Sequence, residues 1–217
     1  AEYYNKIYDY PTYRWYATAT LSNAIGQGEV LLTPIQLANM TATIANRGWY
    51  YTPHMIKEID GKPIKDKRFI KKHHTTIDPE NFEPVVEGMH QVYKNGTASS
   101  LQIEGIEIAG KTGTAENFVR VNGKRMQLTD HSIFVAFAPV DNPKIAIAVF
   151  VENGYWGGRY GGKIASLMIE KYLKGKITRT DLEDFIMDPK NSLEDEYEKP
   201  YSGEPFLIND GKKNGWL

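Results

Sequence analysis

A hexapeptide at residues 110–115, Gly-Lys-Thr-Gly-Thr-Ala, stands at the end of a predicted strand and carries the strongest chemical signal of the sequence. Lys111 offers a cation, Thr112 and Thr114 offer hydroxyl groups, and the same stretch of backbone offers N–H donors. Gly113 has no side chain, so a ligand can approach the strand edge closely. This edge is therefore predicted to bind an anionic, peptide-like ligand that lies antiparallel to it. The alternative is a glycine-rich strand end with a solvated lysine, because Lys-Thr-Gly alone is a short motif.

A second glycine-rich stretch at 157–163, Gly-Gly-Arg-Tyr-Gly-Gly-Lys, fits the phosphate-loop pattern G-x-x-x-x-G-K between a predicted strand and a predicted helix. A nucleotide-binding protein is therefore the alternative function. Two features weaken it: Ile164 stands where a Ser or Thr would ligate Mg²⁺, and Asp141 lies in a hairpin turn. The other reading is a loop that opens a helix beside a substrate cleft, with Tyr155 and Trp156 as candidate walls.

Asp130, His131 and Ser132 contain the residue types of a catalytic triad. Consecutive residues that enter a strand point to alternate faces, so these three side chains cannot relay a proton to one another. We expect a structural turn in which Asp130 accepts backbone hydrogen bonds. The histidines show no metal-ligand spacing, so neither a metal nor a cofactor is predicted.

Composition limits the class of protein. The chain has 217 residues, 41% of them hydrophobic and 24% charged, with a net charge of -1 and no cysteine. This balance predicts a folded core and argues against a strongly basic nucleic-acid binder. The aromatic residues 1–16 resemble a base-stacking platform, but only Lys6 and Arg14 add positive charge there. No apolar run approaches the roughly 18 residues of a membrane span. The chain lacks a signal sequence and an initiator Met, so we expect a piece of a longer protein.

The hydrophobic pattern predicts an α/β or α+β fold in which an antiparallel sheet of at least three strands has helices on its faces. The short connection at 139–143 predicts a hairpin, and the strand after it is apolar on both faces, which is typical of a strand inside a sheet. The composition changes after Gly175, so residues 1–175 are predicted to form the folded portion and 176–217 an acidic, irregular tail with one short helix at 180–186. The other predicted helices are 32–48, 84–94 and 161–173. In the last of these helices the residues expected to face inward are Ile164, Leu167, Met168 and Tyr172. The predicted strands are 103–115, 132–138 and 145–151.

Several stretches together resemble the C-terminal part of the transpeptidase domain of class B penicillin-binding proteins, of the cell-elongation (penicillin-binding protein two) type. Lys-Thr-Gly is itself one of the three established motifs of these enzymes. The stretches that carry the resemblance, in the family's order, are 22–29 with 33–38, 110–116, 130–139 and 147–154.

The resemblance implies D,D-transpeptidation of peptidoglycan through an acyl-serine intermediate, without a cofactor. Lys111 and Thr112, with Thr114, are implied to hold the carboxylate of a stem peptide, and Gly113 lies between them. The Thr114 N–H is implied to be an oxyanion-hole donor. β-Lactams are implied to acylate the same serine. The family also implies a membrane anchor and a location at the periplasmic face of the inner membrane.

The sequence departs from the family in one respect: neither Ser-x-x-Lys nor Ser-x-Asn occurs in it. In the family both motifs precede the position of Ser22. We therefore expect half an active site that is inactive alone, with a non-catalytic binding module as a further alternative. In the family the strand at 145–151 has a second neighbour from the missing part. We expect the isolated chain to form a homodimer along this strand unless residues 13–20 fold back onto it.

Overall fold

The computed structural model describes residues 17–28, 30–122 and 124–196, which fall into two compact units divided between Thr33 and Pro34. In the first unit, α2 (Ala17–Ala24) is a helix. The expected fold-back strand at 13–20 is therefore wrong from Ala17 onward, and its earlier residues lie outside the described part. The aromatic stretch 1–16 also lies outside it.

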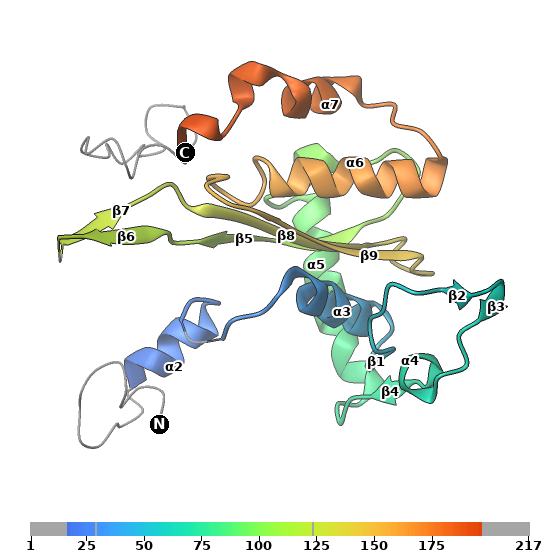
Figure 1. Ribbon diagram of the computed structural model, residues 1–217. Coiled ribbons are helices and arrows are strands. Elements are labelled where there is room, and N and C mark those ends of the chain that lie inside the picture. The colour runs from blue at the N-terminus through green and yellow to red at the C-terminus, as the bar shows by residue number, and fades with distance from the viewer. Residues whose placement is uncertain (1–16, 29, 123, 197–217) are drawn as a thin grey trace. The chain divides into compact units, whose positions relative to one another are not determined.

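The second unit is built around a three-stranded antiparallel sheet, as the sequence predicted (Figure 1). The strands are β5 (Ala109–Ala115), β8 (His131–Ala138) and β9 (Ile145–Val151), in the order β5-β8-β9. In this register Thr112 pairs with Phe134, which in turn pairs with Val149. The central strand is therefore β8, and the hairpin that joins it to β9 is the expected one.

Helices lie on both faces of this sheet. α6 (Gly161–Lys174) packs on β8 and β9 from one face, whereas α3 (Pro34–Ala45) packs on the same two strands from the other (Figure 1). α5 (Glu83–Lys94) packs against β5. The smaller elements are β1 (Trp49–Tyr50) with β4 (His73–His74), β2 (Glu58–Ile59) with β3 (Lys62–Pro63), β6 (Phe118–Val121) with β7 (Lys124–Gln127), α4 (Lys67–Ile70), α7 (Thr180–Met187), and the 3-10 turns η1 (Pro79–Phe82), η2 (Ser99–Leu101) and η3 (Pro189–Asn191).

Two buried clusters hold the layers together, one on each face of the sheet. Successive side chains of β8 point to opposite faces of the sheet, so this strand contributes to both clusters. Phe134 lies in one cluster and Phe137 in the other, and both are fully buried. The cluster under α6 comprises Tyr93, Ala98, Leu101, Ile103, Ile108, Phe134, Ala136, Ala138, Ile147, Ala165 and Ile169. The cluster under α3 and α5 comprises Ala45, Val86, Met89, Ala109, Phe137 and Val140.

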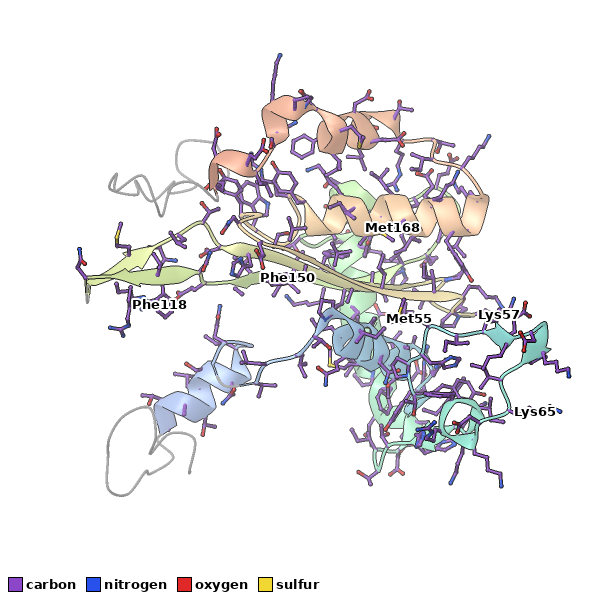
Figure 2. The ribbon with its side chains drawn as sticks, in the orientation of Figure 1. Met55, Lys57, Lys65, Phe118, Phe150 and Met168 are labelled. Atoms are coloured by element: carbon purple, nitrogen blue, oxygen red, sulfur yellow. The ribbon has the colours of Figure 1, made fainter. Side chains whose placement is uncertain are left out.

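Three details differ from the sequence-based expectations. The strand expected from residue 103 begins only at Ala109, because Gly105 turns the chain with a φ of +75°. β9 lies at the edge of the sheet and not inside it. On α6, Met168 and Tyr172 are exposed, whereas Ala165, Ser166 and Ile169 are buried (Figure 2).

The segment after α6 is described as far as Glu196 and contains α7 and η3. It confirms the expected short helix, which ends at Met187 before Pro189. The expected boundary at residue 175 stays a prediction.

We expect the isolated chain to self-associate along β9, because a strand with apolar residues on both faces and one neighbour templates pairing with another chain. Its mass by light scattering should rise toward a dimer with concentration. Phe150→Lys places a charge on the exposed side of β9 and should keep the chain monomeric. Phe118→Lys, at a similarly exposed phenylalanine on β6, is the control and should leave the dimer intact (Figure 2). A monomeric mass at high concentration would contradict the expectation.

Candidate functional site

The hexapeptide at residues 110–115 lies entirely within β5, at one edge of the sheet. β5 pairs with β8 alone among the described strands, so its other edge takes no part in the sheet. An antiparallel peptide ligand could add to such an edge through backbone hydrogen bonds. The structure thus places the predicted residues where a strand-like ligand can reach them.

The side chains of the hexapeptide divide between the two faces of the sheet. Partners across an antiparallel pair share a face, so Thr112 lies on the α6 face with Phe134, and Thr114 lies there too. Lys111 and Gly113 lie on the other face. The exposed Lys111 side chain returns to its own strand, where Nζ donates to the Thr112 carbonyl at 2.8 Å. The Lys111 cation is therefore held at the strand itself.

Sequence reasoning missed Thr97, which lies beside the hexapeptide. Its hydroxyl oxygen is 3.1 Å from that of Thr112, a hydrogen bond between segments 15 residues apart. Thr97 follows the Asn95-Gly96 stop of α5. No periodicity or motif in the sequence links this turn to β5, because the contact depends on how α5 and the sheet pack.

The loop of residues 154–160, here called the aromatic loop, lies directly on the sheet at Gly113. A Cβ atom on Gly157 would lie 2.6 Å from the Ile133 carbonyl oxygen and 2.7 and 2.8 Å from backbone atoms of Gly113. Only glycine allows so close an approach. The fully buried Ser132 hydroxyl fastens the loop, since it donates to the Trp156 carbonyl at 3.0 Å and accepts from the Gly161 N–H at 3.0 Å.

The two candidate walls, Tyr155 and Trp156, belong to this loop, and their rings meet edge to face at 6.2 Å. The Arg159 guanidinium lies 4.3 Å from the centre of the Tyr155 ring and 5.3 Å from that of Trp156. The Tyr155 hydroxyl donates to Glu196 at 2.7 Å. Burial, together with this hydrogen bond, raises the pKa of Tyr155 to about 12. Tyr155 therefore stays a neutral hydroxyl donor at neutral pH.

The phosphate-loop alternative at 157–163 is not favoured. A phosphate cradle needs backbone N–H groups that point at the ligand. Here the Gly161 N–H donates to Ser132, and the Gly162 N–H donates to the Gly157 carbonyl at 2.8 Å. The Lys163 ammonium lies 4.4 Å from the centre of the Phe185 ring. These groups are engaged within the protein.

The structure confirms that Asp130, His131 and Ser132 form no relay. Asp130 accepts the Asn117 N–H at 3.4 Å, as expected of a structural turn. His131 Nδ1 accepts the Asn153 N–H at 3.1 Å, and Ser132 points to the opposite face, under the aromatic loop. Burial lowers the pKa of His131, while the nearby Glu152 and Asp130 carboxylates partly oppose this change.

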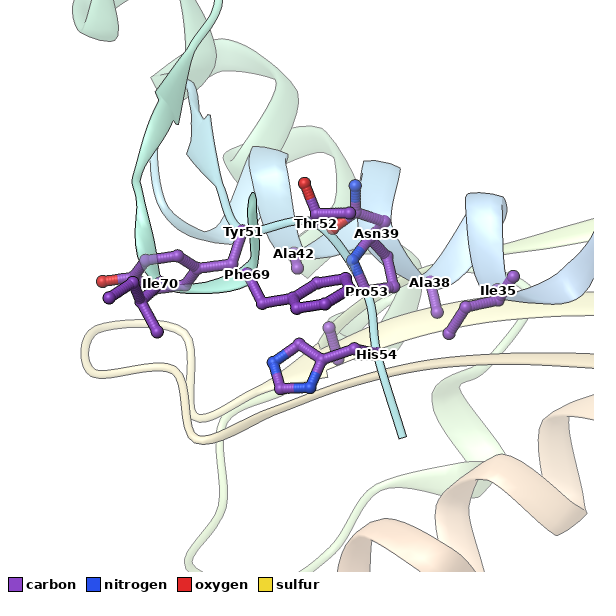
Figure 3. A pocket seen from close by; sticks show the side chains of 11 residues that line it. Ile35, Ala38, Asn39, Ala42, Tyr51, Thr52, Pro53, His54, Phe69 and Ile70 are labelled. Atoms are coloured by element: carbon purple, nitrogen blue, oxygen red, sulfur yellow. The ribbon is translucent and has the colours of Figure 1, made fainter. Parts of the chain in front are cut away.

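A cavity of about 560 Å³ lies away from the hexapeptide (Figure 3). Ala38 and Ala42 of α3, His54, Phe69 and Ala146 of β9 are among its lining residues, and it contains no residue of 110–115. In the part of the chain that the structure describes, no three His, Asp or Glu side chains are placed to hold a metal ion. Within residues 17–28, 30–122 and 124–196, no helix has both the length and the apolar character to cross a bilayer.

Comparison with known proteins matches residues 3–174 to the family described as penicillin binding protein transpeptidase domain. The chain is 38% identical to the peptidoglycan D,D-transpeptidase MrdA of Acinetobacter baumannii over 71% of its own length and 24% of that relative. It is 30% identical to the Haemophilus influenzae protein of the same name over 91% of its length and 32% of that relative. The chain thus spans about a quarter to a third of these relatives.

Solved structures give the same result. PBP2 of Pseudomonas aeruginosa, in complex with WCK 5153, is similar with a TM-score of 0.63 and 37% identity, over 82% of this chain and 38% of that one. Penicillin-binding protein A of M. tuberculosis, as an imipenem acyl-enzyme complex, is similar with a TM-score of 0.55 and 32% identity, over 69% of this chain and 33% of that one.

Gly157→Ala should lower the free energy of unfolding by about 1–3 kcal/mol, because the added methyl group meets backbone atoms that cannot move aside. Gly158→Ala is the matched control, since its nearest atom would be 3.6 Å away and ordinary contact results. Urea unfolding measures both variants, and the Gly113 amide shift in NMR spectra should change only in the first. Equal stability of the two variants would show that the loop does not rest on β5.

The free energy of unfolding should fall as the pH drops below 6.5, in part because of His131. Its pKa in the folded state lies below the ordinary 6.5, so the unfolded chain takes up this proton first. The stability from His131 is fully present above pH 6.5 and is lost as the pH falls through the folded-state pKa. In His131→Asn, urea unfolding between pH 7 and 5 should show a smaller pH slope than in wild type. Identical slopes would contradict the assignment.

Proposed function

Since the chain belongs to the penicillin-binding protein transpeptidase family, of the PBP2 type, we propose that it is part of a peptidoglycan D,D-transpeptidase whose substrate-binding strand is β5. The observation that carries this proposal is the placement of Lys-Thr-Gly-Thr on an edge strand whose outer edge is outside the sheet. The relatives are named as peptidoglycan D,D-transpeptidases, and a similar structure is an acyl-enzyme complex with imipenem.

In the proposed reaction a serine oxygen attacks the carbonyl carbon of the penultimate D-Ala of one stem peptide. The peptide bond to the terminal D-Ala breaks, and that D-Ala leaves with the proton that the serine gives up. The amine of a second stem peptide then attacks the acyl-serine ester: the new peptide bond forms, the ester C–O bond breaks, and a proton of the amine returns to the serine oxygen. β-Lactams enter the same first step, and the ring amide bond opens as the acyl-serine forms.

In this scheme β5 binds the substrate and stabilises charge. Lys111 supplies the cation at the strand, and the Thr112 and Thr114 hydroxyls bind the terminal carboxylate. The Thr114 N–H donates to the oxyanion that develops on the attacked carbonyl. Gly113 leaves room for the peptide backbone. Supporting this, the Lys111 ammonium lies within 2.8 Å of the Thr112 carbonyl, so the charge is at the strand.

Tyr155 and Trp156 line the substrate site in this proposal. Both belong to the aromatic loop, which rests on β5 at Gly113, and Trp156 is 43% exposed. An aromatic face next to a strand edge can pack against the apolar parts of a peptide.

The proposed substrate lies outside the cytoplasmic membrane, so the proposed site of action is the periplasmic face of the inner membrane, with the whole protein anchored there. The serine nucleophile belongs to a Ser-x-x-Lys motif that this sequence does not contain. The chain alone therefore binds without acyl transfer, because donors and a carboxylate clamp cannot capture an acyl group without a nucleophile.

Lys111→Ala should slow acylation by a fluorescent penicillin roughly 10²–10³-fold in a polypeptide that joins this chain to the two missing motif segments. The melting temperature should change little, because Lys111 is exposed and packs against few atoms. Lys144→Ala, at another exposed lysine, is the control and should keep the wild-type rate. Equal rates for Lys111→Ala and wild type would show that this strand does not bind the substrate.

The 217-residue chain serves as the second control in this experiment. After incubation with the same penicillin and a denaturing gel, it should carry no label. A labelled band at the mass of the chain would show that it contains a nucleophile of its own.

A further inference from the structure

The last described segment of the chain, residues 180–196, is tied to the aromatic loop at several points and is here called the C-terminal strap. The strap contains α7 and η3 and packs along α6 through α7 (Figure 1). The Tyr160 hydroxyl donates to the Asn191 carbonyl at 2.8 Å, and the Tyr160 ring lies 5.7 Å from that of Phe185. One end of the loop is thus fixed to the middle of the strap.

Glu196 fixes the other end of the loop. One oxygen of its carboxylate accepts the Tyr155 hydroxyl at 2.7 Å, and the other accepts the Thr129 hydroxyl in a short hydrogen bond. The residue is 9% exposed, so the carboxylate binds these donors largely away from water. Hydrogen bonds to a charged group in such surroundings are stronger than neutral ones. Because Thr129 lies two residues before β8, Glu196 joins the loop to the sheet.

The backbone of the loop needs such support. Tyr155 has a φ of +67°, a left-handed conformation that non-glycine residues adopt at a cost. Such a backbone conformation persists only where contacts with the surrounding structure stabilise it. At Tyr155 these contacts are the N–H bond to the Asp130 carbonyl at 2.9 Å and the side-chain bond to Glu196.

We infer that Glu196 is a positioning residue: through Tyr155 and Thr129 it holds the aromatic loop on β5 and so shapes the face that carries Thr112 and Thr114. Glu196 does not touch the proposed substrate. It acts on the loop, whose Gly157 rests on Gly113 of the binding strand. The role of the loop in substrate binding rests on the proposed function. The contact between the strap and the loop is seen in this chain whether or not that function holds.

The test uses hydrogen exchange and NMR on the 217-residue chain. Glu196→Ala removes both acceptors and should speed exchange of the Tyr155 and Gly162 amides roughly tenfold or more, the effect of one lost charge-assisted hydrogen bond. Exchange of the Ile169 amide, in the middle of α6, should not change. Glu196→Gln keeps one acceptor oxygen and should restore part of the protection. Asp195→Asn, at the exposed neighbour, is the matched control and should behave as wild type.

A second measurement links the loop to the site. An acetylated peptide that ends in D-Ala-D-Ala is titrated into each variant, and the Thr112 and Thr114 amide shifts report binding. Glu196→Ala should weaken this binding severalfold, and Tyr155→Phe, which loses the same hydroxyl bond, should weaken it similarly. Since both variants remove the same hydrogen bond between Tyr155 and Glu196, the double variant should bind no more weakly than Glu196→Ala.

Each result decides between the two claims. Unchanged exchange at Tyr155 and Gly162 in Glu196→Ala overturns the inference, as does faster exchange with unchanged peptide affinity. Uniformly faster exchange that includes Ile169 also overturns it, because Glu196 would then stabilise the fold in general. If the wild-type chain does not bind the peptide at all, the proposed ligand fails, while the exchange data still decide whether Glu196 holds the loop.

Discussion

The close contact of Gly157 with the backbone of β5 and β8 is the constraint on which the candidate site depends. A hypothetical Cβ atom there would lie within 2.8 Å of three backbone atoms, so the loop lies too near to the sheet for any residue other than glycine. Ser132 completes the contact, because its buried hydroxyl binds the loop on one side and the first residue of α6 on the other. These contacts therefore fix the positions of the aromatic loop, the start of α6 and β5 relative to one another.

A buried ion pair fixes the base of the strap. Glu170 of α6 is fully buried, and its carboxylate accepts a hydrogen bond from Nε of Arg179 at 3.1 Å. Burial raises the pKa of Glu170, but the hydrogen bonds from Thr178 and Arg179 outweigh it and leave the pKa below 4.5. Arg179 also donates to the carbonyls of Leu101 and Ser166, at 3.1 and 3.0 Å. An unpaired carboxylate in this position would be costly, so the pair sets where the strap begins.

The sequence predicted the sheet, its central hairpin and the hexapeptide strand, because these depend on local alternation and on turn residues. It failed where packing decides. β9 is apolar on both faces but lies at the edge of the sheet. The pattern of apolar residues indicates which faces of a strand are covered, but not whether a neighbouring strand pairs with each of its edges. Met168 and Tyr172 fit an inward stripe on α6, yet they are exposed, and the buried residues include Ala165, Ser166 and Ile169. At its start the helix lies so close to Phe134 that glycines stand there, Gly161 and Gly162. Thr97 and Glu196 reach the site from distant positions that no local pattern connects.

Under the proposed function, the arrangement separates substrate binding from covalent chemistry. β5 receives its rigidity from β8 and from the clusters on both faces, so the Thr112 and Thr114 donors are held in place without the nucleophile. Preorganised donors stabilise developing charge because they need not reorganise when it appears. A serine brought to the outer edge of β5 would meet donors already aligned along an antiparallel strand. Under the proposed function, the same rigid strand edge would hold a stem peptide and a β-lactam alike, since each presents a carboxylate and a carbonyl to the same backbone.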